Sequence, residues 1–324
     1  MSGEFVNKIP VLDLADFNCG VDSRKKTFVK NLGAAYQEIG FVAITNHYLS
    51  DTLSQELYSE IKIFFALPDE VKQRYEIAAL FGQRGYVGKG KEHAKGRKTG
   101  DLKEFYHIGQ EQDAAESNSA EFPENIWPEE FPAFKTTAVK VYRQLEQTGF
   151  EILRALALFL DLPENYFDSR VKNGNSILRP IHYFPVEDPS AVPADAVRAA
   201  AHGDINLITL LMGASAEGLQ VLNRNDEWIS VTAAPDQLII NVGDMLERLT
   251  NGKLRSTIHR VVNPPPEKLH LPRYSIPFFM HPRSEMSLAA LPNCVDQNHP
   301  KQWPDITAGE FLDQRLREIG LKKQ

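Results

Sequence analysis

The sequence is poor in cysteine, in long apolar runs and in positive charge. It has only two cysteines among 324 residues, Cys19 and Cys294, which cannot form a disulfide framework and suit a reducing cytosol. No stretch approaches the roughly 18 consecutive apolar residues that a membrane span needs, and the N-terminal segment lacks the apolar centre of a signal peptide. We therefore expect a cytoplasmic protein without a membrane partner.

The charge balance excludes a further class of partner. The 36 lysines and arginines are outnumbered by 43 aspartates and glutamates, which gives a net charge of −7. Because phosphate backbones repel an acidic protein, we expect no nucleic-acid partner. The hydrophobic fraction of 42% and the charged fraction of 24% are ordinary for globular proteins and exclude a disordered, collagenous or coiled-coil chain. At this length, one large domain or two small ones are both open.

The first half of the chain alternates short β-prone runs with amphipathic helical patterns. Apolar residues spaced three and four apart predict three long helices, and two short apolar runs predict strands. The helices are expected at Asp22–Ile39, Asp51–Leu67 and Ala133–Leu160, and the strands at Ile9–Leu14 and Phe41–Ile44. Pro68 and the acidic residues after it indicate a further helix start. Residues 82–121 are rich in glycine and polar residues, so we expect no long element there.

The second half consists of short β-prone runs separated by glycine, proline and asparagine. The seven predicted strands are Ser176–Phe184, Ile205–Met212, Leu219–Leu222, Trp228–Val231, Gln237–Asn241, Thr257–Val262 and Tyr274–Met280. Strands at this spacing indicate a sandwich, a jelly roll or a barrel. A final helix is expected at Ala308–Ile319. No segment resembles a domain linker, so we favour one domain with a β core that N-terminal helices surround.

One short motif at the start of the β-rich half suggests a metal site. His202 and Asp204 form a His-x-Asp motif, and in extended backbone side chains two positions apart point the same way. His259 lies in a β-branched strand, where an inward-facing histidine needs a partner. Two histidines and one carboxylate form the facial triad of non-haem Fe(II) oxygenases, which leaves room for a chelating co-substrate and O₂. The alternatives are a pair of turn residues for His202 and Asp204 and a hydrogen-bonded core histidine for His259.

A second polar pair lies on a later strand. Arg273 and Ser275 share one face of the run Pro-Arg-Tyr-Ser-Ile, and Tyr274 takes the other face. A guanidinium beside a hydroxyl on an otherwise apolar strand is suited to bind a carboxylate through two hydrogen bonds. The alternative is a buried ion pair between Arg273 and an acidic residue.

An ordered set of motifs over nearly the whole chain resembles the Fe(II)/2-oxoglutarate dioxygenase superfamily, specifically its isopenicillin N synthase-like branch. The motifs are Ile9-Pro-Val-Leu-Asp-Leu, Gly40-Phe-Val-Ala-Ile-Thr-Asn-His47, Phe64-Phe-Ala-Leu-Pro68, Asn241-Val-Gly-Asp-Met-Leu, Ser256-Thr-Ile-His-Arg-Val-Val and Pro272-Arg-Tyr-Ser. The resemblance implies a mixed α and β fold, a double-stranded β-helix (jelly roll) with N-terminal helices packed around it. It implies one oxygenase domain, 1–324, with a mainly helical region 1–172, a jelly-roll core 173–285 and a C-terminal helix in 286–324.

The resemblance also implies roles for individual residues. His202, Asp204 and His259 match the iron ligands of the family. The residues that match its 2-oxoglutarate site are Arg273 and Ser275, which bind the distal carboxylate, and Tyr183, which often hydrogen-bonds that carboxylate. For Tyr183 an ordinary strand aromatic is an equally good interpretation.

The enzyme that the resemblance implies is a non-haem Fe(II)- and 2-oxoglutarate-dependent dioxygenase. It would use O₂ to oxidise, most often to hydroxylate, a small organic substrate, with release of succinate and CO₂. Isopenicillin N synthase shares the Arg-x-Ser pair but does not use 2-oxoglutarate, so a 2-oxoglutarate-independent Fe(II) oxidase is an alternative. A non-catalytic ligand receptor on the same fold is another, although an intact triad counts against it.

Substrate selection is expected in the first half of the chain and in loops over the iron. Phe105, Tyr106 and Arg283 are candidates to line the pocket. The charged segment 89–104 is interpreted either as a lid that recognises an acidic substrate or as a solvated loop. An amino acid or a small carboxylic acid is the first candidate for the substrate.

Overall fold

Helices dominate the first half of the chain in the computed structural model, which describes residues 8–91, 103–111, 122–185, 198–212 and 218–318. The helices there are α1 (Leu14–Asn18), α2 (Asp22–Glu38), α3 (Asp51–Phe65), α4 (Asp69–Gln73), α5 (Pro132–Phe159) and α6 (Asp168–Val171). The strands are β1 (Val11–Asp13), β2 (Phe41–Thr45), β3 (Gly85–Val87) and β4 (Lys103–Gly109). The three predicted long helices are confirmed, as is the helix that starts after Pro68.

Short strands make up most of the second half. They are β5 (Ile177–Leu178), β6 (Ile181–Tyr183), β7 (Ala199–His202), β8 (Ile208–Met212), β9 (Leu219–Leu222), β10 (Trp228–Ser230), β11 (Leu238–Val242), β12 (His259–Val261), β13 (Arg273–Ser275) and β14 (Pro277–Met280). Two helices, α7 (Asp244–Leu249) and α8 (Ala308–Glu318), complete this half. In the described part of the chain, no helix is both long enough and apolar enough to cross a membrane.

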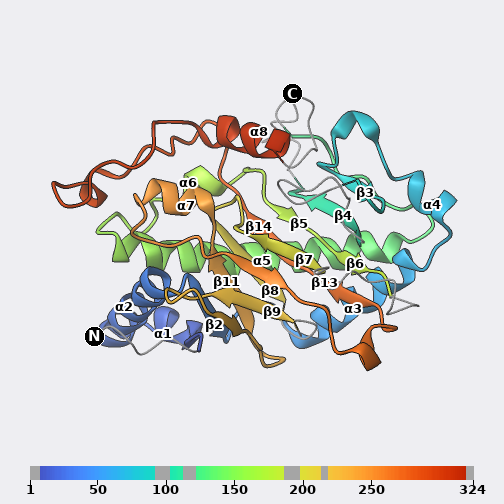
Figure 1. Cartoon of the computed structure of the whole chain (residues 1–324), viewed down its shortest axis with the longest axis horizontal. Helices are drawn as coiled ribbons and strands as arrows, with labels where there is room; N and C mark the ends of the chain where they lie inside the picture. The colour runs from blue at the N-terminus through green and yellow to red at the C-terminus, as the bar shows by residue number, and fades with distance from the viewer. Residues whose placement is uncertain (1–7, 92–102, 112–121, 186–197, 213–217, 319–324) are drawn as a thin grey trace.

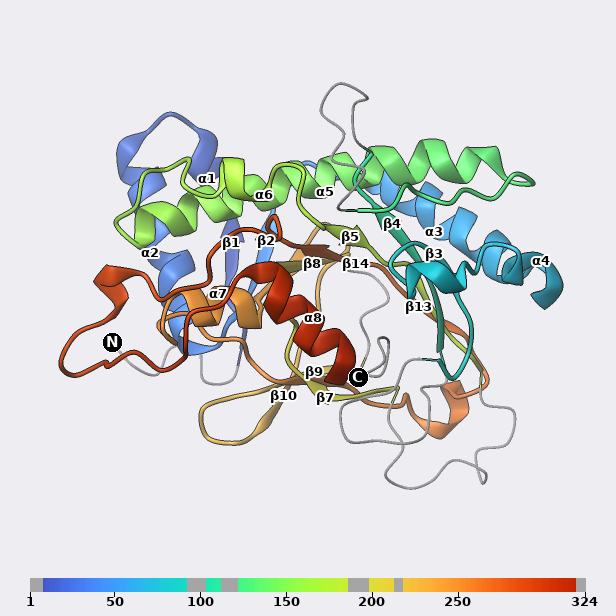
Figure 2. The same ribbon diagram turned by 90° about the horizontal axis from the view of Figure 1, so that it is seen from above.

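Two sheets form the core of the molecule. The ten-stranded sheet has the order β1-β2-β11-β8-β14-β5-β4-β6-β13, with β3 paired to β4, and the four-stranded sheet has the order β10-β9-β12-β7. Helices α2, α3 and α5 lie on one side of the large sheet, and the small sheet lies on the other side (Figures 1 and 2). This arrangement confirms the predicted jelly roll with helices packed against it.

Strands from the first half complete the large sheet, and this corrects one prediction. Residues 82–121 are not simply irregular, because β3 pairs with β4, and β4 pairs with both β5 and β6. All of β4 is buried except its first residue, Lys103. A strand covered on both faces has no alternating polar pattern, and its charged and glycine residues concealed it in the sequence.

Two runs predicted as single strands are each divided in the structure. Ser176–Phe184 forms β5 and β6, which separate at Arg179-Pro180, where proline has no N–H for a ladder hydrogen bond. Tyr274–Met280 likewise corresponds to β13 and β14, and Pro277 opens the second of them. The two divided runs then pair with each other piece by piece: β5 pairs with β14, and β6 pairs with β13.

Helix α5 fixes the outer face of the large sheet. Gly149 of α5 packs so closely that a Cβ at this position would lie 2.4 Å from Met280 Sδ. The Tyr142 ring packs edge-on against Phe278 at 4.9 Å, and its hydroxyl donates to the carbonyl oxygen of Ser176. Since side chains alternate along a strand, the remaining positions of β8 and β14 face the small sheet.

Glu146 of α5 is expected to make stability depend on pH. Burial raises the pKa of this carboxyl to about 7, although Arg143 and a hydrogen bond from Gln110 lower it. Below about pH 4.5 the carboxyl is protonated in both the folded and the unfolded chain, so its burial does not lower the free energy of unfolding. Between pH 4.5 and 7 only the unfolded chain ionises, and stability falls by on the order of 2 kcal/mol.

Glu146→Gln removes this charge but keeps an oxygen that accepts from Gln110 Nε2. The variant should match the parent in urea unfolding at pH 4.5 and exceed it at pH 8. A stability difference that is the same at both pH values would contradict the prediction.

Candidate metal centre

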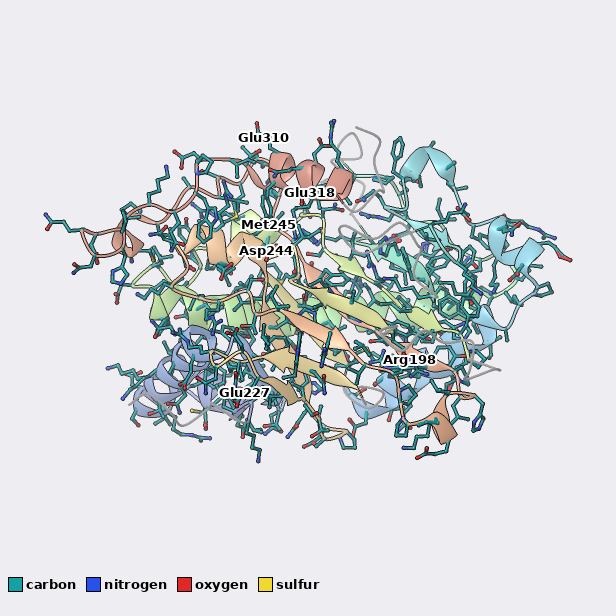
Figure 3. The ribbon with its side chains drawn as sticks, in the orientation of Figure 1. Arg198, Glu227, Asp244, Met245, Glu310 and Glu318 are labelled. Carbon is teal, nitrogen blue, oxygen red and sulfur yellow. The ribbon has the colours of Figure 1, made fainter. Side chains whose placement is uncertain are left out.

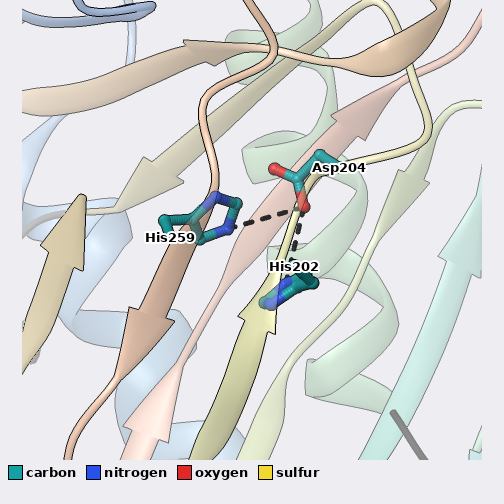
Figure 4. Close-up of side chains that lie close together, drawn as sticks. All are labelled: His202, Asp204 and His259. Atoms are coloured by element: carbon teal, nitrogen blue, oxygen red, sulfur yellow. Dashed lines mark ion pairs between the residues drawn. The ribbon is translucent and has the colours of Figure 1, made fainter. Parts of the chain in front are cut away.

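The two predicted histidines lie opposite each other on neighbouring strands of the small sheet. His202 ends β7, His259 begins β12, and the two are cross-strand partners. Asp204 Oδ1 lies 3.9 Å from His202 Nε2 and 3.7 Å from His259 Nε2. The three side chains converge (Figure 4), and one ligand atom from each lies within 4.8 Å of the others. Strand pairing therefore brings all three predicted ligands into one cluster.

Backbone carbonyls set the orientation of both imidazole rings. His202 Nδ1 lies 2.7 Å from the carbonyl oxygen of Ala200, and His259 Nδ1 lies 3.2 Å from that of Thr257. Because a carbonyl oxygen only accepts, each Nδ1 carries a proton, and in the neutral ring Nε2 keeps its lone pair. The Phe41 ring packs edge-on against His259 with centroids 5.6 Å apart. Both Nε2 atoms are thus available as metal ligands.

Two hydrogen bonds orient the carboxylate of Asp204. Its Oδ2 accepts from Thr209 Oγ1 at 2.6 Å and from Asn241 Nδ2 at 2.8 Å, so Oδ1 is left for the histidines. Burial alone would raise the pKa of Asp204, but the adjacent histidines and these two hydrogen bonds outweigh it and lower the pKa. The carboxylate is therefore ionised, as a metal ligand must be.

Removing one of these hydrogen bonds should weaken metal binding. Asn241→Leu keeps the approximate volume but deletes the donor to Asp204 Oδ2, so the carboxylate is held by Thr209 alone. Loss of such an outer hydrogen bond costs about 10-fold to 100-fold in metal affinity. Anaerobic titration of the apoprotein with Fe(II) measures the effect, and Thr209→Val tests the second donor in the same way. The interpretation fails if both variants bind Fe(II) as tightly as the parent.

Arg273 and Ser275 lie on β13, the edge strand of the large sheet next to β6. Arg273 is the cross-strand partner of Tyr183, and its guanidinium carbon lies 5.1 Å from the centroid of that ring. Arg273 and Ser275 are each only 6% exposed. Within the described residues, Nε and Nη1 of Arg273 have no hydrogen-bond partner. A buried guanidinium with two unused donors is suited to bind an anion.

The alternation along β4 separates two residues that were predicted to line one pocket. Phe105 belongs to a small buried cluster with Tyr183, on the face that carries Arg273. Tyr106 faces the helices instead, where its ring packs edge-on against Phe64 of α3 at 5.0 Å. Tyr106 therefore points away from the face that carries Phe105 and Arg273, because adjacent residues of a strand point to opposite faces.

The remaining candidates for the substrate side are Arg283 and the charged segment 89–104. Arg283 follows β14 and pairs with Glu285 at 2.6 Å, with both side chains partly exposed. Most of the predicted lid at 89–104 lies outside the described residues. Its last residue, Glu104, belongs to β4, is 1% exposed and binds Lys72 Nζ at 2.8 Å and His182 Nδ1 at 2.7 Å. Glu104 is therefore part of the core and not of a solvated loop.

Arg179, which the sequence analysis did not identify, lies beside Phe105. Its guanidinium carbon is 4.6 Å from the centroid of Phe105 and 5.1 Å from that of Phe279 on β14. Its Nε donates to His107 Nε2, while Nδ1 of the same histidine lies beside the carbonyl oxygen of Gly82. The guanidinium is thus held in place by two aromatic rings and the imidazole of His107.

His281 is a second polar residue that sequence reasoning missed. It follows Phe279 by two positions, is 7% exposed, and its Nδ1 has no hydrogen-bond partner among the described residues. Burial lowers the pKa of His281 to about 4, with Asp204 opposing and Arg179 reinforcing the shift. His281 is therefore neutral, and it lies within electrostatic reach of both the triad and Arg179. Alternation from Phe279 was the one available sequence signal for it.

A jelly roll on which two histidines and a carboxylate converge has the architecture and the ligand set of non-haem metal oxygenases. Comparison with known proteins leads to the same class. Residues 9–130 match the family described as non-haem dioxygenase in morphine synthesis N-terminal, and residues 174–282 match the 2OG-Fe(II) oxygenase superfamily.

Individual relatives match along nearly their whole length. A 2OG-Fe(II) oxygenase family protein of Caulobacter crescentus is 43% identical, with a TM-score of 0.86 over 97% of this chain and 99% of its own. A full-length Neurospora crassa protein, solved in complex with alpha-KG and thymine, is 31% identical, with a TM-score of 0.84 over 97% and 98%. Proline hydroxylase buaE of Petromyces alliaceus is 32% identical over 94% of this chain and 97% of its own.

The chain belongs to the 2-oxoglutarate–Fe(II) oxygenase superfamily. It is an Fe(II)- and 2-oxoglutarate-dependent dioxygenase, and its co-substrates are 2-oxoglutarate and O₂.

Proposed function

We propose that the protein hydroxylates a small organic substrate at an Fe(II) ion held by His202, Asp204 and His259. The observation that carries this proposal is the cluster of three ligand atoms within 4.8 Å. Two neutral imidazoles and one ionised carboxylate are the ligand set of non-haem Fe(II) oxygenases. Three protein ligands leave positions for a co-substrate and O₂, which a closed structural site would not.

The 2-oxoglutarate site is proposed to consist of Arg273, Ser275 and Tyr183. Support comes from Nε and Nη1 of Arg273, which have no hydrogen-bond partner in the described part of the chain, and from the burial of all three residues. A guanidinium can donate two parallel hydrogen bonds to a carboxylate, and its charge would then be compensated inside the protein. The adjacent hydroxyls of Ser275 and Tyr183 can donate to the same carboxylate.

The bound Fe(II) and 2-oxoglutarate supply the oxidising chemistry, in which O₂ and 2-oxoglutarate yield succinate, CO₂ and one oxygen atom inserted into a C–H bond. The residues of the chain bind the metal and the co-substrate, orient them, and exclude water from the site. Thr209 and Asn241 hold the Asp204 carboxylate in one orientation, and Arg273 fixes the far end of the co-substrate. No side chain has to act as a general base, so none is assigned that role.

The substrate is inferred to bind against Phe105, Arg179 and His281. These three side chains combine an aromatic ring, a cation and a neutral imidazole whose Nδ1 has no hydrogen-bond partner among the described residues. It suits a small molecule with an apolar body and a carbonyl or carboxylate oxygen, such as an amino acid or a carboxylic acid. The thymine bound to the Neurospora relative and the proline in the name of the Petromyces relative are small molecules with such oxygens.

Residues 1–324 are further proposed to act as one domain in the cytosol. The large sheet combines strands from both halves of the chain, so neither half has a complete sheet of its own. Cys19 is exposed, Cys294 is buried and both are free thiols, which suits a reducing compartment.

The proposed function is tested by a substrate screen that measures succinate release. The parent protein is incubated with Fe(II), ascorbate and 2-oxoglutarate, together with amino acids, small carboxylic acids and thymine. Substrate-dependent succinate and a product heavier by one oxygen atom are expected, and the oxygen should derive from ¹⁸O₂. His259→Ala, which removes one ligand, serves as the control that should release none.

Two results would contradict the proposal. If no substrate yields succinate, and 2-oxoglutarate leaves the spectrum of the anaerobic ferrous protein unchanged, an oxidase that does not use 2-oxoglutarate becomes the better hypothesis. A product that has lost two hydrogens would keep the dioxygenase but replace hydroxylation by desaturation.

A further inference from the structure

We propose that the C-terminal helix α8 sets the relative position of the metal ligands through an ion pair between Arg315 and Asp244. The inference rests on the proposed metal site, but it concerns residues that lie outside it. Asp244 is the first residue of α7, and α7 contacts both segments that carry the ligands. Arg315 and Asp244 are therefore assigned as positioning residues.

The first turn of α7 is bonded to the segment around Asp204. The backbone N–H of Asp244 donates to the carbonyl oxygen of Asp204 at 2.7 Å, and that of Gly243 donates to the carbonyl oxygen of Leu207 at 2.9 Å. The side chain of Asp244 packs against Gly203, where an added Cβ would lie 2.9 Å from Asp244 Oδ1. A shift of α7 would therefore move the backbone on both sides of Asp204.

The same helix is bonded to the segment before His259. Asp244 Oδ1 accepts from Ser256 Oγ at 2.6 Å, and Glu247 Oε1 accepts from the backbone N–H of Ser256 at 3.1 Å. Ser256 precedes His259 by three positions. Asp244 thus joins the two ligand segments, one through its backbone and the other through its side chain.

Arg315 reaches Asp244 from α8. Its Nη2 lies 3.2 Å from Asp244 Oδ2, and its Nη1 lies 2.9 Å from Glu318 Oε2. The side chains of Arg315 and Asp244 are only 22% and 23% exposed, so solvent screens this pair less than a surface ion pair. Figure 3 shows labelled Asp244 on α7 below α8, with Glu318 near the end of the helix. The ion pair holds one oxygen of Asp244 while Ser256 holds the other.

Helix α8 is docked by other contacts, so Arg315 can be removed without releasing it. At its start, the backbone N–H of Ala308 donates to the carbonyl oxygen of Met286 at 2.9 Å, and that of Gly309 donates to the carbonyl oxygen of Ser284 at 2.9 Å. Phe311 is 8% exposed and packs in the main core, with the Arg248 guanidinium 5.6 Å from its ring centroid. Loss of Arg315 should therefore act on Asp244 and not on the position of the whole helix.

The test is the affinity for Fe(II) alone, measured by anaerobic titration of the full-length apoprotein. Arg315→Ala is expected to raise the Kd for Fe(II) about tenfold, the lower end of the range for residues that orient metal ligands. Arg315→Lys should recover most of this loss, because an ammonium can still pair with Asp244. The matched control is Arg317→Ala, since Arg317 pairs with Asp313 on the same helix and its side chain is 46% exposed. This control should bind Fe(II) as the parent does.

A double-mutant cycle separates positioning from general destabilisation. Asp244→Asn and Arg315→Ala remove the same contact, so their effects on the Kd should not add in the double variant. Additive effects, an unchanged Kd in Arg315→Ala, or an equal loss in Arg317→Ala would each overturn this inference. If the parent itself binds no more Fe(II) than His259→Ala, the proposed metal site fails, and that result is distinct from the other three.

Discussion

Asp204→Ala is expected to abolish substrate-dependent succinate formation and to weaken Fe(II) binding by more than about 100-fold. The variant removes the one anionic ligand from a site whose other two ligands are neutral, so the charge of the metal is no longer compensated. The loss should exceed the roughly 10-fold to 100-fold that residues behind a ligand contribute. Asp204→Asn keeps the side-chain shape and a partner for Thr209, but its affinity for Fe(II) should fall by nearly as much.

Fe(II) titration and succinate assays are run on both variants and on a matched control. Asp236→Ala removes the same charge from an exposed position and should behave as the parent. Unfolding temperatures verify that the apoproteins remain folded. If Asp204→Ala keeps its biological activity, the metal is not needed and the receptor hypothesis replaces the enzyme.

Arg273→Leu is expected to raise the KM for 2-oxoglutarate about 100-fold while leaving the affinity for Fe(II) unchanged. Losing one partner of a buried charge pair costs about 2–5 kcal/mol, and each 1.4 kcal/mol is a factor of ten. Metal binding should not change, because His202 and His259 lie on strands of the small sheet and Arg273 lies on the large one. Arg273→Lys should be intermediate, since an ammonium keeps the charge but not the paired donors.

The dependence of succinate formation on 2-oxoglutarate concentration gives the KM, and Fe(II) titration gives the second readout. Arg260→Leu serves as the control, because Arg260 carries the same charge but packs over Trp228 at 3.9 Å and bonds Gln220. An unchanged KM would exclude Arg273 from the co-substrate site. A parallel loss of Fe(II) affinity would instead indicate that Arg273 supports the fold.

His202 and Asp204 could be proposed as a pair from their spacing, whereas His259 lies far along the chain and the full set of three came from the resemblance to the superfamily. His-x-Asp places two ligands on one side of an extended segment, and a histidine in an apolar strand requires a partner. The pairing of His202 with His259 in the small sheet then brought the three ligands together. Arg273 and Ser275 were predictable for the same reason, since alternation alone assigns them to one face.

The residues around this cluster depended on contacts between distant segments. Tyr106 could not be separated from Phe105 until the sheet faces were known, and His281 had no motif of its own. Thr209 and Asn241 lie on different strands, and only the pairing of β8 with β11 brings both to Asp204. Such contacts leave no periodic signal in the sequence, because the partner of each side chain depends on which remote segment packs against it.

The sequence by itself therefore indicated the kind of oxygenase, the three proposed metal ligands and the pair proposed for the co-substrate, through an ordered set of motifs that resembles the superfamily. Side-chain spacing alone left an alternative open for each of these residues. The tertiary structure decided that β4 lies in the large sheet, that His281 lies within electrostatic reach of Asp204, and that α8 contacts α7 through Arg315. The physical reason is that strand register and helix docking bury surface contributed by remote segments, and no local pattern encodes which segments meet.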